Sequence, residues 1–131
     1  EGNQITSFQN LHLPETLKYL NANSNPIGDN YEIHLSQLQI LSLSNCSIKS
    51  FNCKNVPSSI THLDLRDNTE LDSITHVGHF DDLRILNIKN TRIKTLDYSK
   101  FKRMNDHNLI IKCDPGIKFK KVKPDWITIE H

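Results

Sequence analysis

Residues 60–74 read ITHLDLRDNTELDSI, and this stretch decides the fold. Ile60, Leu63 and Leu65 stand at relative positions 1, 4 and 6, and Asn68 follows before the next apolar residue. The same apolar spacing recurs every 21 to 23 residues, and a fixed period of this size indicates a solenoid of stacked repeats. The triplets are Leu17-Leu20-Ala22, Leu38-Leu41-Leu43, Ile60-Leu63-Leu65 and Leu83-Leu86-Ile88, followed by a degenerate fifth in which only Leu109 and Ile111 remain.

A small residue that can form hydrogen bonds closes each predicted strand. It stands five positions after the second apolar residue of the triplet, where the backbone leaves the strand and its amide groups need partners. We expect this side chain to bond the main chain in every repeat. The closing residues are Asn25, Cys46, Asn68, Thr91 and Asp114.

The composition is that of a folded domain. The chain has 131 residues, of which 36% are hydrophobic and 24% are charged, and its formal net charge is +1. This length is sufficient for one domain with a core, and the small net charge gives no field that favours nucleic acid or a membrane surface. The sequence has no apolar run of about eighteen residues and no signal peptide, so we expect a soluble protein.

Both ends of the chain differ from the repeats. Ile5 and Phe8 match the second half of a repeat whose strand is missing, and no initiator Met is present. We therefore expect a fragment of a longer protein in which Glu1-Gly2 is a processing remnant. We predict a single domain over residues 1–131, with repeats over 3–114 and a carboxy-terminal cap over 115–131. Phe119, Val122 and Trp126 are expected to cover the last repeat, while the lysines of the cap face solvent.

The residues between the buried strand positions point outward, because a strand alternates its faces. Aligning the triplets predicts three columns on a concave parallel sheet. The first column holds Tyr19, Ile40, His62, Ile85 and Asn108; the second holds Asn21, Ser42, Asp64, Asn87 and Ile110; the third holds Asn23, Ser44, Arg66, Lys89 and Lys112.

This face combines exposed isoleucines with a basic third column, which suits a protein or peptide partner that carries an acidic element. Scattered surface isoleucines and charges that only solubilise the protein are the alternative interpretation. The predicted recognition surface is Ile40, His62, Asp64, Arg66, Ile85, Lys89 and Lys112.

Catalytic motifs are missing from the sequence. Four glycines do not form a phosphate-binding loop, and neither GxSxG nor HExxH occurs. His76 and His79 form an HxxH near Asp81 and Asp82, a spacing that could hold a metal, although polar residues in a return segment need no special role. We predict a protein without catalytic activity, cofactor or metal.

The cysteines and the lysine cluster add two expectations. Cys46, Cys53 and Cys113 are odd in number and form no CxxC pair, which favours the cytosol or the nucleus. The lysines at 118–123 could contact phosphate, but a solvated face over the cap explains them better.

The pattern LxxLxLxxNxIxxI, with about 22 residues per repeat, resembles the leucine-rich repeat superfamily, in particular its short intracellular class. The resemblance covers about residues 3–114 and implies an α/β solenoid of about five repeats, with a parallel sheet on the concave side and irregular or 3-10 structure on the convex side. It also implies a protein-interaction module. Residues 13–25 and 56–63 further resemble the LPxxLxxLxAxxN repeats of bacterial effector proteins.

Two functions follow from this resemblance. The domain is either a binding module of an intracellular scaffold or regulatory protein, or the substrate-recognition part of a ubiquitin ligase of the F-box or bacterial effector type. A third alternative is that these repeats only complete the core of a longer solenoid.

Overall fold

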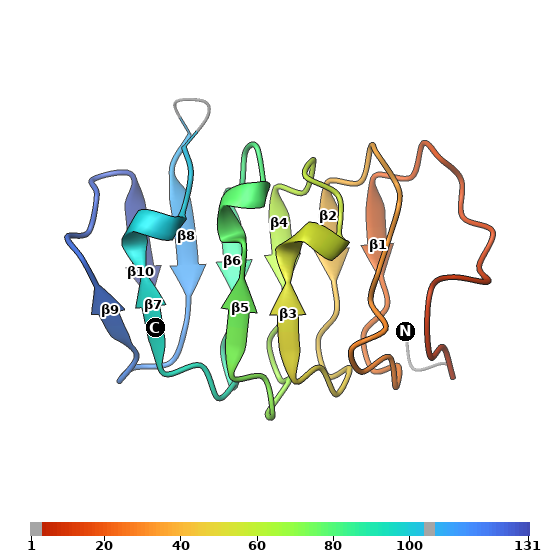
Figure 1. Ribbon diagram of the computed structural model, residues 1–131, viewed down its shortest axis with the longest axis horizontal. Coiled ribbons are helices and arrows are strands. Elements are labelled where there is room, and N and C mark those ends of the chain that lie inside the picture. Colours follow the sequence, from red (N-terminus) through yellow and green to blue (C-terminus); the bar gives the residue numbers. More distant parts are fainter. Residues whose placement is uncertain (1–3, 104–106) are drawn as a thin grey trace.

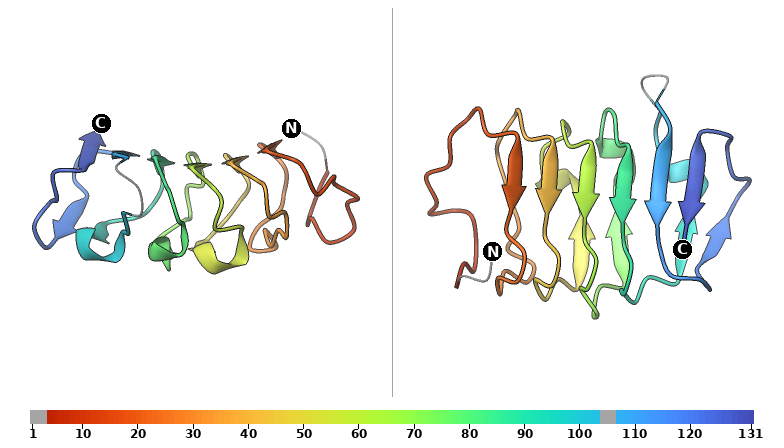
Figure 2. Two further views of the ribbon diagram at one scale, coloured as in Figure 1. Left: turned by 90° about the horizontal axis from the view of Figure 1, so that it is seen from above. Right: turned by 180° about the vertical axis from the view of Figure 1, so that it is seen from behind.

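The structure is a computed structural model that describes residues 4–103 and 107–131; Glu1-Gly2 and residue 3, where the repeats were predicted to begin, lie outside this part. The chain forms a parallel β-solenoid of about four stacked turns (Figure 1). One side of every coil contributes a short strand to a six-stranded parallel sheet (Figure 2). Its strands are, in spatial order, β1 (Tyr19–Asn21), β2 (Ile40–Ser42), β4 (His62–Asp64), β6 (Ile85–Asn87), β8 (Leu109–Lys112) and β10 (Ile127–Glu130).

The opposite side of the solenoid carries shorter and less regular elements. Strand β3 (Ser50–Asn52) pairs with β5 (Ser73–Thr75), and β7 (Thr95–Asp97) pairs with β9 (Lys118–Lys120). A single 3-10 turn follows three of these strands, and no α-helix occurs in residues 4–103 and 107–131. The 3-10 turns agree with the prediction, whereas the sequence did not indicate the two strand pairs. These turns are η1 (Cys53–Asn55), η2 (Val77–His79) and η3 (Tyr98–Lys100).

The core lies between the two sides and is built from the predicted apolar triplets. Leu41, Leu63 and Leu86, at the centres of neighbouring strands, are at most 1% exposed. The flanking positions of the second, third and fourth triplets are buried as well, so the predicted core of these coils is confirmed. Leu17 and Leu20 of the first triplet are only partly buried because their coil lies at the end of the stack.

Asn68 shows how each coil is closed after its strand. Its side chain is fully buried, and its Oδ1 accepts hydrogen bonds from the backbone N–H groups of Cys46 (2.9 Å) and Ile48 (3.1 Å) in the preceding coil. Its Nδ2 donates to the carbonyls of Leu43 (2.9 Å) and Leu65 (2.8 Å), and more weakly to that of Arg66 (3.4 Å). One side chain thus joins two coils and satisfies buried main-chain groups of both.

The same position in other coils serves the same purpose. Asn25 Oδ1 accepts from the N–H of Ile5 at 3.2 Å, Cys46 Sγ contacts the carbonyl of Ala22 at 3.2 Å, and Thr91 Oγ1 donates to Ile88 at 2.9 Å. Asp114 Oδ2 accepts a hydrogen bond from the backbone N–H of Asn90 at 2.9 Å, so the predicted bond to the main chain is present in all five coils. In the first four coils, the residue before the closing residue has a positive φ of 54–62°, a conformation that Asn and Asp tolerate better than most residues. These turn residues are Ser24, Asn45, Asp67 and Asn90.

The register of the fifth repeat differs from the prediction by two residues. Ile85 pairs with Ile110 rather than with Asn108, and Asn87 pairs with Lys112 rather than with Ile110. The inward positions of this coil are accordingly filled by Ile111 and Cys113, both fully buried. The prediction was wrong because it took Leu109 and Ile111 as the last two members of the triplet and did not count Cys113 as apolar.

Residues 115–131 continue the solenoid, although their sequence shows no triplet. Strand β9 joins β7, and β10 extends the main sheet beside β8. Phe119 packs against the core and stacks on Tyr98 with ring centroids 4.7 Å apart, and Trp126 also packs against the core. The prediction that Val122 covers the last repeat was wrong, because its side chain is 89% exposed.

Candidate functional site

The exposed face of the six-stranded sheet, here called the sheet face, is where the predicted recognition residues lie. The right-hand view in Figure 2 looks onto this sheet, whose strands lie side by side in a nearly straight row. Tyr19 is 57% exposed and the next four members of its column are partly exposed, so a largely apolar row crosses the sheet. This apolar row consists of Tyr19, Ile40, His62, Ile85, Ile110 and Thr128.

A shallow hollow of about 250 Å³ lies over the middle of the apolar row. It brings together six of the seven predicted residues; Lys89 does not line it and stands in the third column, next to Arg66. The structure thus places six of the predicted residues around one depression. The six predicted residues that line the hollow are Ile40, His62, Asp64, Arg66, Ile85 and Lys112.

Asp64 lines the hollow and also stabilises the turn that follows its strand. Its Oδ1 accepts a hydrogen bond from the backbone N–H of Arg66 at 3.1 Å, and its Oδ2 lies 3.4 Å from Arg66 Nε. Asn21 and Asn87, at the same position of other coils, accept the equivalent bond from the residue two places on, at 3.0 and 3.1 Å. An Asn or Asp in the second column thus supports the turn that follows the strand.

The imidazole of His62 lies at the centre of the apolar row. Its Nδ1 is 2.8 Å from Thr61 Oγ1. Burial, with a smaller contribution from the charge of Arg84, lowers the pKa of His62 below its ordinary value, so the ring is held neutral and part of the apolar surface. Arg84 itself is bound by Asp82, with Nη2–Oδ2 at 2.8 Å, and its Nη2 lies 2.9 Å from His107 Nε2.

The charges of the sheet face are arranged differently from the prediction. The third column continues from Arg66 through Lys89 to Asp114, while Lys112 belongs to the second column between Asn87 and Glu130. The predicted continuous basic edge was therefore wrong, as a result of the two-residue shift in register. The basic groups still lie close to the hollow, but each has an acidic neighbour.

The beginning of the third column is buried rather than available to a partner. Asn23 Oδ1 accepts hydrogen bonds from Ser42 Oγ at 2.7 Å and from the backbone N–H of Ser44 at 2.8 Å. All three side chains are at most 7% exposed. These small polar residues therefore join neighbouring coils, and the surface open to a partner is the apolar row with the charged residues of the later coils.

Comparisons of the chain with known proteins found no match. The sequence matches no family model, no curated protein and no solved structure. The candidate site therefore depends on its own geometry.

Three of the four residues considered for metal binding, His79, Asp81 and Asp82, are used in other contacts. His79 Nε2 lies 2.8 Å from the carbonyl oxygen of Val56, and Asp82 binds Arg84. Asp81 Oδ1 is 3.6 Å from Lys102 Nζ. Within the described part of the chain, no three His, Cys, Asp or Glu side chains form a group that could hold a metal ion. No helix in that part is long and apolar enough to cross a membrane.

The three thiols are buried and lie away from the hollow. Burial raises the pKa of Cys53 to about 12 and also raises the pKa of Cys46 and of Cys113. A thiol with a raised pKa is a poor nucleophile at neutral pH. These cysteines act as small core residues.

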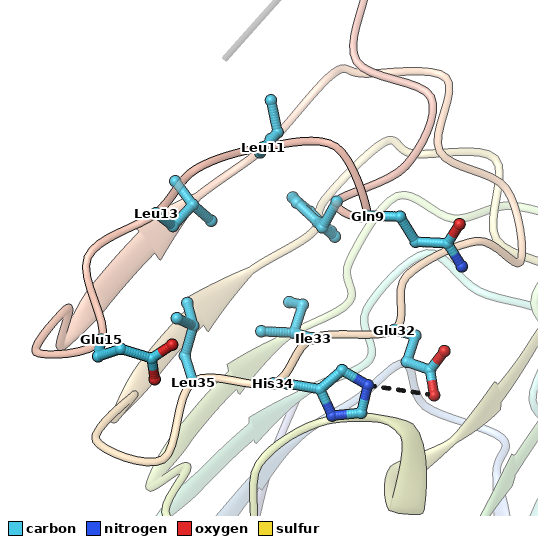
Figure 3. A pocket seen from close by; sticks show the side chains of 9 residues that line it. Gln9, Leu11, Leu13, Glu15, Glu32, Ile33, His34 and Leu35 are labelled. Atoms are coloured by element: carbon cyan, nitrogen blue, oxygen red, sulfur yellow. Dashed lines mark ion pairs between the residues drawn. The ribbon is translucent and has the colours of Figure 1, made fainter.

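A second hollow, of about 320 Å³, lies at the amino-terminal end and was not foreseen from the sequence (Figure 3). It separates the segment 8–15, which precedes the first strand, from residues 32–35 of the following coil. Leu13, Ile33 and Leu35 face it from both sides, and Glu15 and Glu32 lie on its rim. His34 Nε2 is 3.4 Å from Glu32 Oε1. Its apolar residues lie outside the LxxLxL triplets, which is why the repeat pattern did not reveal it.

Proposed function

We propose that the protein is a non-catalytic interaction module of the leucine-rich repeat type, with about five repeats, that binds an extended protein or peptide segment across the sheet face. The observation that carries this proposal is that the central hollow lies over the apolar row. Exposure of the apolar side chains of Ile40 and Ile85 to water is unfavourable, so burying them against a partner would be favourable. They flank His62, whose lowered pKa keeps its ring neutral.

The charged neighbours define the kind of segment that fits. Arg66 and Lys112 line the hollow, and Lys89 lies next to Arg66. If the bound segment places an apolar side chain in the hollow, an acidic residue beside it in that segment would contact one of these cations. Because Asp64 is 3.4 Å from Arg66, we expect the charges to contribute less to affinity than the apolar contact does. The partner is therefore a protein or peptide with apolar anchors and an acidic element, and the proposed location of the protein is inside the cell.

A library of random peptides displayed on phage tests this proposal, with the purified chain as bait. We expect enrichment of sequences that combine large apolar residues with Asp or Glu. Ile40→Asp/Ile85→Asp should abolish binding of the selected peptides, and Arg66→Glu/Lys89→Glu should weaken it by about tenfold at low salt.

The matched control is Lys49→Glu/Lys94→Glu, which makes the same charge change at exposed positions outside the six-stranded sheet. This variant should bind like the unmodified chain. Peptides that bind all three variants equally would place the binding surface elsewhere and contradict the proposal.

A further inference from the structure

The two ends of the solenoid carry complementary surfaces. Figure 1 places the loop between β9 and β10 at one end of the long axis and the segment before β1 at the other. The first surface, here called the tail, consists of Lys120 at the end of β9 and residues 121–123 of the following loop. The second, here called the head, is the hollow shown in Figure 3.

The tail presents an apolar side chain surrounded by cations. Val122 is 89% exposed, the largest exposure among the large hydrophobic residues of the described chain. Lys120, Lys121 and Lys123 stand next to it in sequence, and the only acid nearby in the loop is Asp125. Lys121 has a φ of 71°, so the chain turns sharply between β9 and Val122. An apolar side chain so exposed and flanked by cations can enter an acidic apolar hollow without rearrangement of the loop.

The head has the opposite character. Its floor includes Leu13, Ile33 and Leu35, and Leu11 at its rim is 39% exposed. The ionisable residues that line it are Glu15, Glu32 and His34. An apolar side chain flanked by lysines matches this surface both in polarity and in charge.

We propose that the protein associates head to tail, with Val122 of one copy in the head of the next and with Lys120 and Lys121 of the tail facing Glu15 and Glu32. The second copy is the occupant that the structure favours, because the same chain carries the exposed valine, the basic flank and the acidic apolar hollow. The contact joins two different surfaces, so one association leaves a free head and a free tail and chains of copies can grow. The sheet face remains open in such a chain, and this inference does not depend on the proposed function.

The position of the Lys123 side chain indicates that the tail, and not the free edge of β10, forms the contact with the next copy. Its Nζ donates to the carbonyl of Ile127 at 2.9 Å, on the terminal strand of the sheet. A lysine bound there hinders a further strand from pairing with β10. Val122, next to Lys123, is therefore the apolar side chain that the carboxy-terminal end of the solenoid offers to a second copy.

Sedimentation velocity tests the proposal on the 131-residue chain, at concentrations up to about 1 mM and at two salt concentrations. We expect the weight-average mass to rise with concentration and this rise to diminish in 0.5 M NaCl, because ionic contacts are screened (roughly a 4 Å Debye length). A chain that stays monomeric over the whole range would overturn the proposal.

Two variants distinguish head-to-tail association from any symmetric contact. Lys121→Glu/Val122→Asp removes the tail, and Leu11→Asp/Glu15→Lys removes the head; each variant alone should stay monomeric. An equimolar mixture should form a dimer and nothing larger, because the intact tail of one variant meets the intact head of the other. Association of either variant alone, or a mixture that stays monomeric, would refute the head-to-tail arrangement.

Thr75→Asp is the control, since Thr75 is exposed on β5 in the middle of the molecule. It should associate like the unmodified chain. Equal urea midpoints for all variants would show that the changes act on association and not on folding.

Discussion

The turn after β4 and the turn after β8 follow equivalent strands of the six-stranded sheet, but they are stabilised by different groups. After β4, Asp67 takes a positive φ and Asn68 enters the core, where it bonds two coils. After β8, Asp114 is partly exposed and accepts one bond, from the N–H of Asn90 at 2.9 Å, and Gly116 has the positive φ of 97°. The first turn is held by a buried side chain and the second by a glycine and a surface carboxylate.

This difference explains where the repeat pattern fails. A buried closing residue specifies the register, since a shift would leave buried amide groups without partners. The last coils have no such residue, and there the predicted register was wrong by two positions. The following variants test whether the closing residue also controls stability.

The largest effect is expected for Asn68→Ala. The substitution leaves the N–H groups of Cys46 and Ile48 without their acceptor and two carbonyls without a donor. We expect the free energy of unfolding to fall by about 3 kcal/mol, as measured by urea denaturation. Asn108→Ala, at an exposed position, is the control and should change it little. Equal effects of the two variants would show that the buried amide does not stabilise the fold.

The second prediction compares the regions by thiol labelling. Cys46, Cys53 and Cys113 are all fully buried, so alkylation requires opening of the structure. Cys113 lies next to the terminal coil, where fewer coils cover it, and we expect iodoacetamide to label it about tenfold faster than Cys46 in dilute urea. Mass spectrometry of the digested protein gives the three rates. Earlier labelling of Cys46 would reverse the order of stability proposed here.

A smaller effect is expected for Asp114→Ala, because its carboxylate is partly exposed and accepts a single hydrogen bond. The loss of stability should be about 0.5 kcal/mol, far less than for Asn68→Ala. Asp114→Asn keeps an acceptor and should be close to the unmodified chain in the same urea titration. A loss as large as that of Asn68→Ala would mean that both turns depend equally on their side chains.

The smallest effect concerns His62. Because its pKa is lowered in the folded state, the folded chain binds fewer protons than the unfolded one. Stability is therefore retained above pH 6.5, the ordinary value, and decreases as the pH falls through the lower folded pKa. His62→Gln should reduce this decrease, as measured by urea denaturation at a series of pH values. A His62 pKa above 6.5 by NMR titration would contradict the burial of the ring.

The repeat pattern predicted the fold well where side chains are selected by burial alone. Leu38, Leu41 and Leu43 could be assigned to the core because alternation in a strand and the regular period each demand apolar residues there. Asn25 and Asn68 could be assigned to the coil closure because a buried backbone needs partners. The strands β3, β5, β7 and β9 could not be predicted, since their pairing depends on which coils become neighbours.

The candidate site shows the same division. Ile40, His62 and Ile85 could be placed in one row because strand alternation and a constant period are local properties of the chain. The position of Lys112 relative to Asn87 and Glu130 required the three-dimensional register, and so did the exposure of Val122 and the hollow behind Leu13 and Leu35.

The sequence by itself determined that this protein is a solenoid of stacked repeats with a parallel sheet, which residues form the core of its central coils, and which side chains close them. The tertiary structure alone decided the register of the last coils, the charge pattern of the sheet face and the different character of the two ends. The physical reason is that burial and backbone hydrogen bonding repeat with every coil and leave a periodic pattern. Register and end surfaces instead depend on contacts between segments that occur only once.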